Sequence, residues 1–244
     1  ASHIPNHWSR LTPPEVGAAA FNYCDAAISS AIAIILHTAD SPTDRATLAL
    51  TRCCLSSRGG GLGTADYSRR SPSNYTSAFI SAWPASCSAC PALSSIAISP
   101  TSTSPAIVSF CTAYEHVSST LASVRDRHSA LDANTRTWVD GSCHSAYRLP
   151  VPRSLELPNP ADLFGDAPST PASRLSQRSL AAVVNSDAWM VTMADCAGFD
   201  NANPGTVLRR EAALFVSCSQ EGAGAWLARL PDASLFRSVT PSTT

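Results

Sequence analysis

Apolar residues recur at helical spacing along this chain, and several of these segments begin with a hydroxyl residue followed by proline. The starts are Thr12-Pro13, Ser41-Pro42, Ser71-Pro72, Ser104-Pro105 and Thr170-Pro171. A hydroxyl at the N-cap accepts a hydrogen bond from the first turn, and proline at the first helical position has no N–H to leave unpaired. No stretch of convincing length alternates apolar and polar residues. The pattern predicts a mainly α fold, an irregular multi-helix bundle.

The helix that starts at Thr12 is expected to be the longest and the most buried one. Its apolar positions form one broad stripe: Val16, Ala20, Tyr23, Ala27, Ile28, Ala31, Ile32, Ile35 and Leu36. Residues 1–11 before it are expected to be irregular, with Trp8 anchored on this helix. A shorter helix is expected from Ser41 to about Cys54, with Leu48 and Leu55 turned inward.

Four glycines between Gly59 and Gly63 predict a hinge, because glycine enters sharp turns and positive φ without steric cost. After the hinge, the helix from Ser71 places Tyr75, Phe79 and Trp83 on one face, and we expect Pro84 to end or redirect it. The hinge is therefore predicted to dock one helix against another. It lacks the lysine of a phosphate-binding Walker loop, which favours a structural turn.

The rest of the chain divides into helices and a proline-rich connector. A helix from Ser104 to about His128 should bury Ile107, Phe110, Cys111, Tyr114, Val117, Leu121 and Val124. Six prolines between Pro150 and Pro171 exclude a continuous helix there. A helix from Thr170 to Gly198 and another over 207–218 follow. We predict a helical region around the Gly59–Gly63 hinge (1–130), a connector (131–170) and a small C-terminal helical region (171–244).

Composition narrows the environment and the chemistry. The net charge of −1 argues against a wholly basic nucleic-acid binder, and all 17 basic residues are arginine. Any phosphate contact must therefore use the planar guanidinium group. Nine irregularly spaced cysteines predict an intracellular, reducing compartment. No signal peptide is visible, and Asn22 and Asp25 interrupt the length that a membrane span needs, so we expect a buried helix at 26–36 and no membrane span.

The most basic window of the sequence surrounds the glycine hinge. It contains Arg52, Arg58, Arg69 and Arg70, with Tyr67 among them. Arginine beside aromatic residues and a flexible loop is typical of a surface that follows an RNA or DNA backbone. The alternative is a solvated helix edge with no ligand.

The cysteines offer one further candidate site. Cys87 and Cys90 have the spacing of a zinc-ligand pair, but no second pair with matching spacing follows them. The alternative is a pair of free or buried thiols. Cys143 and His144 beside Asp140 resemble a nucleophile, base and orienting acid in composition only. We expect no metal and no cofactor.

Three stretches carry a resemblance to one family. They are the GGLG turn at residues 60–63 with the Tyr- and Ala-containing helix after it, HWSRLTPPEVGAAAFNYCDAAI at 7–28, and LFVSCSQEGAGAWLARLP at 214–231. Taken in their order along the chain, they resemble the region just beyond the polymerase core of reverse transcriptases from non-LTR retroelements. The resemblance implies a helical, thumb-like and linker portion that grips nucleic acid. The family's downstream Cys/His knuckle has no counterpart in the sequence.

Polymerase chemistry needs two or three carboxylates that hold metal ions, and the sequence has no adjacent Asp pair. We therefore expect no enzymatic activity. The first hypothesis is a non-catalytic remnant of a reverse transcriptase that contacts an RNA or DNA backbone. The second is a structural or accessory subunit with protein neighbours in a large assembly. The third is a chance open reading frame from a GC-rich genome.

Overall fold

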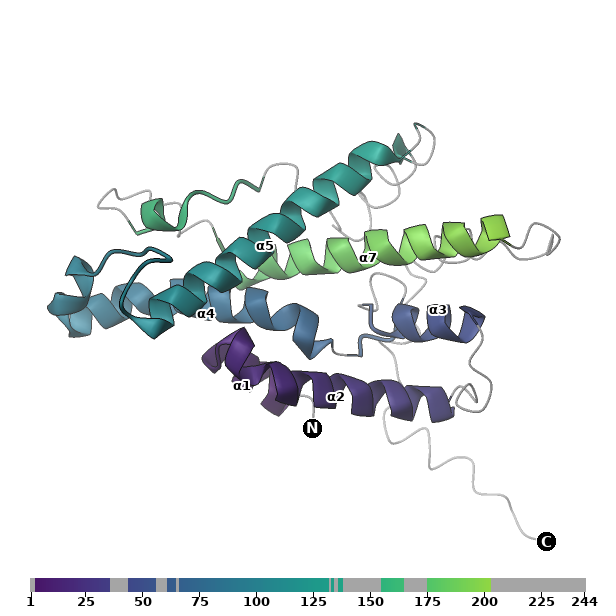
Figure 1. The fold of residues 1–244 in the computed structure, drawn as a ribbon, viewed down its shortest axis with the longest axis horizontal. Helices are drawn as coiled ribbons and strands as arrows, with labels where there is room; N and C mark the ends of the chain where they lie inside the picture. The colour runs from purple at the N-terminus through teal and green to yellow at the C-terminus, as the bar shows by residue number, and fades with distance from the viewer. Residues whose placement is uncertain are drawn as a thin grey trace, which may run out of the picture.

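The fold was obtained as a computed structural model, which describes residues 3–35, 44–55, 61–64, 66–131, 133, 136–137, 155–164 and 175–202. In these residues the chain forms six α-helices and no β-strand, which confirms the mainly α prediction. The helices are α1 (His3–Leu11), α2 (Pro14–Ile35), α3 (Asp44–Cys53), α4 (Tyr67–Ala89), α5 (Pro105–Ala130) and α7 (Gln177–Ala202) (Figure 1). Two short 3-10 helices, η2 (Pro91–Ser95) and η3 (Pro160–Asp162), lie between them.

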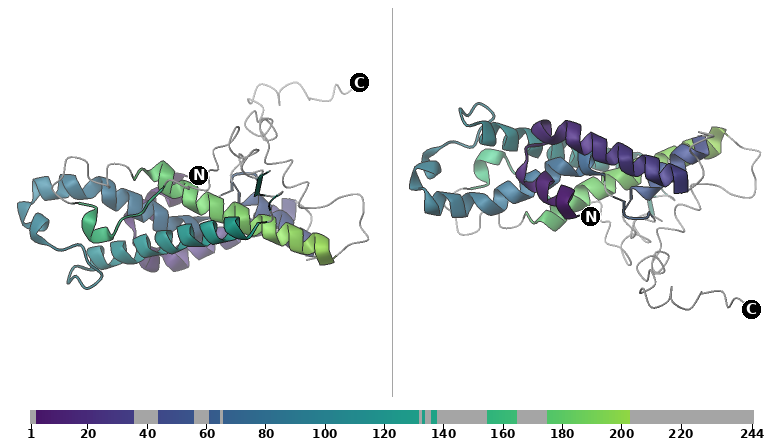
Figure 2. Two further views of the ribbon diagram at one scale, coloured as in Figure 1. Left: turned by 90° about the horizontal axis from the view of Figure 1, so that it is seen from above. Right: turned by 90° about the horizontal axis from the view of Figure 1, so that it is seen from below.

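Helix α4 is the centre of the arrangement. It contacts α1 and α2 on one side and α5 and α7 on the other, as Figure 1 and the two views of Figure 2 show. Residues 71–77 are therefore buried all around the helix, although they include serine, threonine and asparagine. The helix after the glycine hinge is thus the element on which the others pack.

An aromatic cluster joins α4 to α5. Phe79 stacks on Phe110 with 4.2 Å between ring centroids and on Trp83 with 5.2 Å. Together with Tyr75 these side chains form the predicted apolar face of the helix after the hinge. Stacked rings contribute beyond the apolar area they bury, so this face holds α4 and α5 together.

The main core continues through the connector into α7. Leu163, beside η3, and Leu180, on α7, are fully buried in the same cluster as Phe110. All seven residues expected to be buried on α5 are buried there, which confirms that helix and its inward face. The core thus spans the boundaries predicted at residues 130 and 170.

The start and the end predicted for the central helix are wrong. Helix α4 begins at Tyr67, not at Ser71, because Asp66 caps it by accepting a hydrogen bond from the Arg69 N–H at 3.0 Å. Pro72 lies inside the helix, and the Ser71 hydroxyl donates instead to the Ser68 carbonyl that proline leaves unpaired. Pro84 also lies inside, on the exposed side, and the helix continues to Ala89.

The N-terminal predictions also need correction. Residues 3–11 form a helix, and Trp8 is 59% exposed instead of anchored. Helix α2 buries only Gly17, Phe21 and Ile32 and is shorter than α5 and α7, so it is neither the longest nor the most buried helix.

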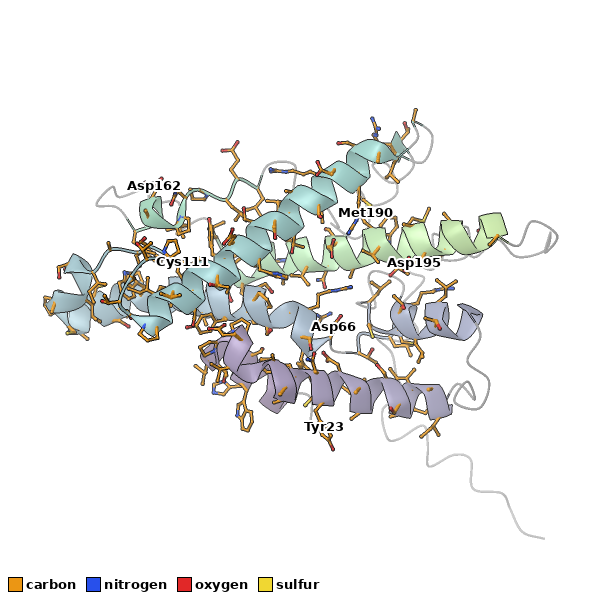
Figure 3. The ribbon with its side chains drawn as sticks, in the orientation of Figure 1. Tyr23, Asp66, Cys111, Asp162, Met190 and Asp195 are labelled. Atoms are coloured by element: carbon orange, nitrogen blue, oxygen red, sulfur yellow. The ribbon has the colours of Figure 1, made fainter. Side chains whose placement is uncertain are left out.

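Most of the expected stripe of α2 is exposed, although Ile28 is half-buried and Ile32 is buried. Val16 is 72% exposed and Tyr23 is 76% exposed, and Figure 3 shows Tyr23 pointing outward. The physical reason is that α2 is apolar on nearly every side, so its polar contact decides which face turns inward: Asp25 binds the start of α4. Helix α2 is long and apolar enough to cross a membrane, but the core helix of a soluble protein can also meet these two criteria. The absence of a membrane span stays a prediction.

The described part of the glycine hinge folds back on the end of α3. The N–H groups of Leu62 and Thr64 donate to the Cys53 carbonyl, and that of Gly63 donates to the Leu55 carbonyl. Gly63 has a positive φ of 72°, and a Cβ at Gly61 would lie 2.3 Å from two carbonyl oxygens. Glycine is required at both positions, and the hinge packs on the end of α3. That it docks one helix against another stays a prediction, because α4 packs mainly on α1, α2, α5 and α7 rather than on α3.

The shorter helix predicted after Ser41 is confirmed as α3, with Leu48 and Leu55 buried. Helix α7 buries Leu180, Val183 and Val184 as expected. It begins at Gln177 and not at Thr170, since residues 175–176 are not helical, and it ends at Ala202, four residues beyond the predicted end. The helix predicted at 207–218 lies outside the described residues, as do Gly59 and Gly60.

Candidate anion-binding site

Three helices meet around a polar pocket of about 380 Å³. Each helix contributes residues spaced by three or four positions, so that they share one face. Helix α1 contributes His7 and Arg10, α4 contributes Arg70, Ser73 and Asn74, and α7 contributes Gln177, Ala181 and Asn185. The pocket is thus formed by side chains from both ends of the described chain.

The charge of the pocket is positive. Arg10 and Arg70 face it from two different helices, and no described residue of its lining carries a carboxylate. Within the described residues, neither guanidinium forms an ion pair, whereas Arg127 on α5 pairs with Asp187 on α7. Two cations around one hollow repel each other, and an anion between them would remove that repulsion.

Buried hydrogen bonds hold the pocket wall in place. The Asn74 side-chain N–H donates to the hydroxyl of Ser9, which is fully buried on α1, at 2.9 Å. The Ser73 hydroxyl donates to the Arg70 carbonyl at 2.9 Å. The Asn74–Ser9 bond fixes α1 on α4, so His7 and Arg10 keep their position relative to Arg70. On the side of the pocket that α7 forms, the small side chain of Ala181 leaves space.

The predicted basic window is split by the fold. Arg70 faces the pocket, but its neighbour Arg69 turns away and pairs with Asp66 at 3.6 Å. Asp66 lies at the start of α4 (Figure 3). Tyr67 is only 2% exposed, and burial raises its pKa. A ring with so little free surface offers no face for stacking a base.

Of the other two predicted arginines, only Arg52 is described by the structure. Arg52 is half-buried near the end of α3 and is not among the pocket residues. Arg58 lies outside the described residues. A nucleic-acid role for either residue stays a prediction.

The candidate zinc pair lies at the far end of α4. Cys87 is half-buried and Cys90 is exposed, and both are free thiols. Among the residues that the structure describes, no group of three or more His, Cys, Asp or Glu side chains could hold a metal ion. Cys143, His144 and Asp140 lie outside the described part of the chain.

The sequence analysis did not predict the residues that α1 contributes to the pocket, His7 and Arg10. Residues 1–11 were expected to be irregular, but they form α1, and Pro5 is tolerated because proline in the first turn of a helix removes no bond that the helix would make. The usable signal was the spacing of His7 and Arg10, which places them on one face of a helix. The amides of α7 gave no comparable signal.

Comparison of the chain with protein-family models, with curated proteins and with solved structures found no match. The resemblance to the reverse-transcriptase region therefore stays a prediction, and the function of this chain has to be argued from the pocket itself.

Proposed function

We propose that this chain is a non-catalytic helical protein that binds the phosphate groups of RNA or DNA through the pocket between α1, α4 and α7. The observation that carries the proposal is the pair of guanidinium groups, Arg10 and Arg70, in a hollow whose described lining residues include no carboxylate. Arginine forms paired hydrogen bonds with phosphate oxygens, which a compact ammonium group does not do.

The proposal draws further support from the surroundings of the pocket. Neutral donors from Asn74, Gln177 and Asn185 line it, and side-chain amides are common partners of phosphate and sugar groups. The net charge of the chain is −1, so a general attraction to polyanions is weak and binding depends on this local site. The same task is what the resemblance to the thumb-like region implies.

The test measures the binding of fluorescent single-stranded RNA and DNA by anisotropy over a range of salt concentrations. We expect Arg10→Ala and Arg70→Ala each to weaken binding by about tenfold, the worth of one charge-assisted hydrogen bond. Each should also reduce the slope of log affinity against log salt by about 0.7, the value for one lost single-strand phosphate contact.

Arg178→Ala is the matched control. Arg178 is exposed on α7 next to Gln177 but does not line the pocket, so its substitution removes the same charge from the same region. If it weakens binding as much as the pocket variants do, the chain attracts nucleic acid by charge alone and the site is not this pocket. Template-dependent nucleotide incorporation by the purified chain would contradict the non-catalytic part of the proposal.

A second function is favoured by the exposed apolar face of α2. Its two acidic residues are engaged within the chain, Glu15 with the Ser109 hydroxyl and Asp25 with the start of α4. The outward face, with Val16, Tyr23 and Ile34, is therefore apolar and without an ionised group. Such a face fits an apolar helix of a neighbouring protein in an assembly.

Purification from the native source separates the two functions. Nuclease treatment that releases the co-purifying material supports the nucleic-acid function. A protein partner that stays bound after nuclease, and is lost with Ile34→Glu but not with Glu115→Gln on α5, supports the accessory-subunit function. A partner that is retained by Ile34→Glu would exclude the α2 face as its binding surface.

A further inference from the structure

The shape and charge of the pocket indicate which kind of phosphate group it binds. This inference rests on the proposed function. The pocket is small compared with the length of a continuous strand. Here α1, α4 and α7 line a hollow of about 380 Å³ that is partly open to solvent, near the lower end of the range for small-molecule sites. A hollow of this kind suits one nucleotide better than a run of them.

Charge balance points to the end of a strand. An internal phosphodiester carries one negative charge, whereas a terminal phosphomonoester carries about −1.5 to −2 at neutral pH. Among the residues that the structure describes, the pocket presents two guanidinium groups, those of Arg10 and Arg70, and no carboxylate. The phosphomonoester neutralises both cations, while an internal phosphate would leave one of them uncompensated.

The remaining wall suits the nucleoside part. Gln177, Ala181 and Asn185 lie one turn apart on α7, and Ala181 leaves space between the two amides. Amide side chains can both donate and accept hydrogen bonds, as ribose hydroxyls and base edges require.

We infer that the pocket binds a nucleoside 5′-monophosphate group, with Arg10 and Arg70 on the phosphate and the α7 amides on the sugar or base. That chemistry occurs at the 5′-phosphorylated end of a strand and in a free mononucleotide. Binding is non-covalent, and no bond of the ligand is made or broken.

The experiment compares one short single-stranded RNA with a 5′-phosphate and with a 5′-hydroxyl end, and uses adenosine 5′-monophosphate and adenosine as competitors. We expect the phosphorylated RNA to bind at least about tenfold more tightly, and the monophosphate alone to compete. Arg10→Ala, Arg70→Ala and the pocket-filling Ala181→Leu should each bring the ratio of the two affinities close to one. Arg178→Ala should retain it, and circular dichroism with a melting curve verifies that each variant is folded.

The outcomes distinguish this inference from the proposed function. Equal affinity for both RNAs, with loss of binding in the arginine variants, would overturn the inference and leave the proposed function standing. Binding of the free monophosphate without binding of either RNA would contradict the proposed function, leave the inference standing and identify the mononucleotide as the ligand. A tenfold preference that Ala181→Leu and the arginine variants do not change would place the end-binding site elsewhere and overturn the inference.

Discussion

The Asp25 carboxylate on α2 caps α4 from 42 residues away, because its Oδ1 accepts a hydrogen bond from the Tyr67 N–H at 2.7 Å. Its Oδ2 accepts a second bond from the Ser68 N–H at 2.9 Å. Asp66 supplies the third acceptor of the same helix start. Two carboxylates at one N-terminus satisfy backbone groups that would otherwise need water, and they fix α2 to the central helix.

Asp25→Ala should therefore destabilise the fold by about 1–2 kcal/mol, the usual cost of losing a helix cap. Chemical denaturation followed by circular dichroism measures it. Asp195→Ala is the control, since Asp195 is exposed on α7 and its loss should change stability by less than about 0.5 kcal/mol. Equal effects of the two substitutions would mean that the long-range cap contributes nothing.

This cap also explains how far the sequence could predict the fold. Helix α5 was predictable because its apolar residues keep to one face and Ser104-Pro105 marks its start. The beginning of α4 was not, because one of its caps comes from a distant helix. The orientation of α2 was not predictable either, since an evenly apolar helix contains no periodic signal for its buried face. The pocket requires α1, α4 and α7 together, and only Arg70 lay in the basic window visible in the sequence.

Substitution by alanine should change the stability of the fold in opposite directions at Gly61 and at Gly198. At Gly61 a Cβ would lie 2.3 Å from the carbonyl oxygens of Arg52 and Leu55, so Gly61→Ala forces the loop off the end of α3. We expect a loss of about 2 kcal/mol or more. At Gly198, in α7, an added Cβ meets nothing within 4 Å, and alanine should stabilise the helix by about 0.5–1 kcal/mol.

Melting curves of the two variants, recorded side by side, check this pair. A stable Gly61→Ala protein would show that the hinge has room to rearrange without loss of the α3 contacts. A destabilised Gly198→Ala protein would contradict the open surroundings of that residue.

Tyr114 should make the fold sensitive to alkali. Burial raises its pKa above the ordinary value of about 10, and its hydroxyl donates to the Pro158 carbonyl at 2.7 Å. Above about pH 10 the unfolded chain loses this proton while the folded chain keeps it, so the unfolded state binds fewer protons and stability falls as pH rises. Its contribution is fully present below pH 10 and is lost toward the higher folded-state pKa.

Urea unfolding at several pH values above 10 measures this effect. The group adds a slope of about 1.4 kcal/mol per pH unit, which Tyr114→Phe should remove. At neutral pH the same variant should lose about 1 kcal/mol, the net worth of one hydrogen bond. Parallel stability curves for the two proteins above pH 10 would show that Tyr114 ionises equally in both states.

Helix α2 offers a matched pair for testing which of its faces is inward. Phe21 is 3% exposed and Ile34 is 66% exposed on the same helix. Phe21→Ala should cost about 3–5 kcal/mol, the range for a buried aromatic side chain, because it leaves a cavity beside Gly17. Ile34→Ala should cost less than about 0.5 kcal/mol in the isolated chain. A large loss for Ile34→Ala would show that the outer face of α2 is covered in solution, and a change in sedimentation of the variant would then show whether a second copy covers it.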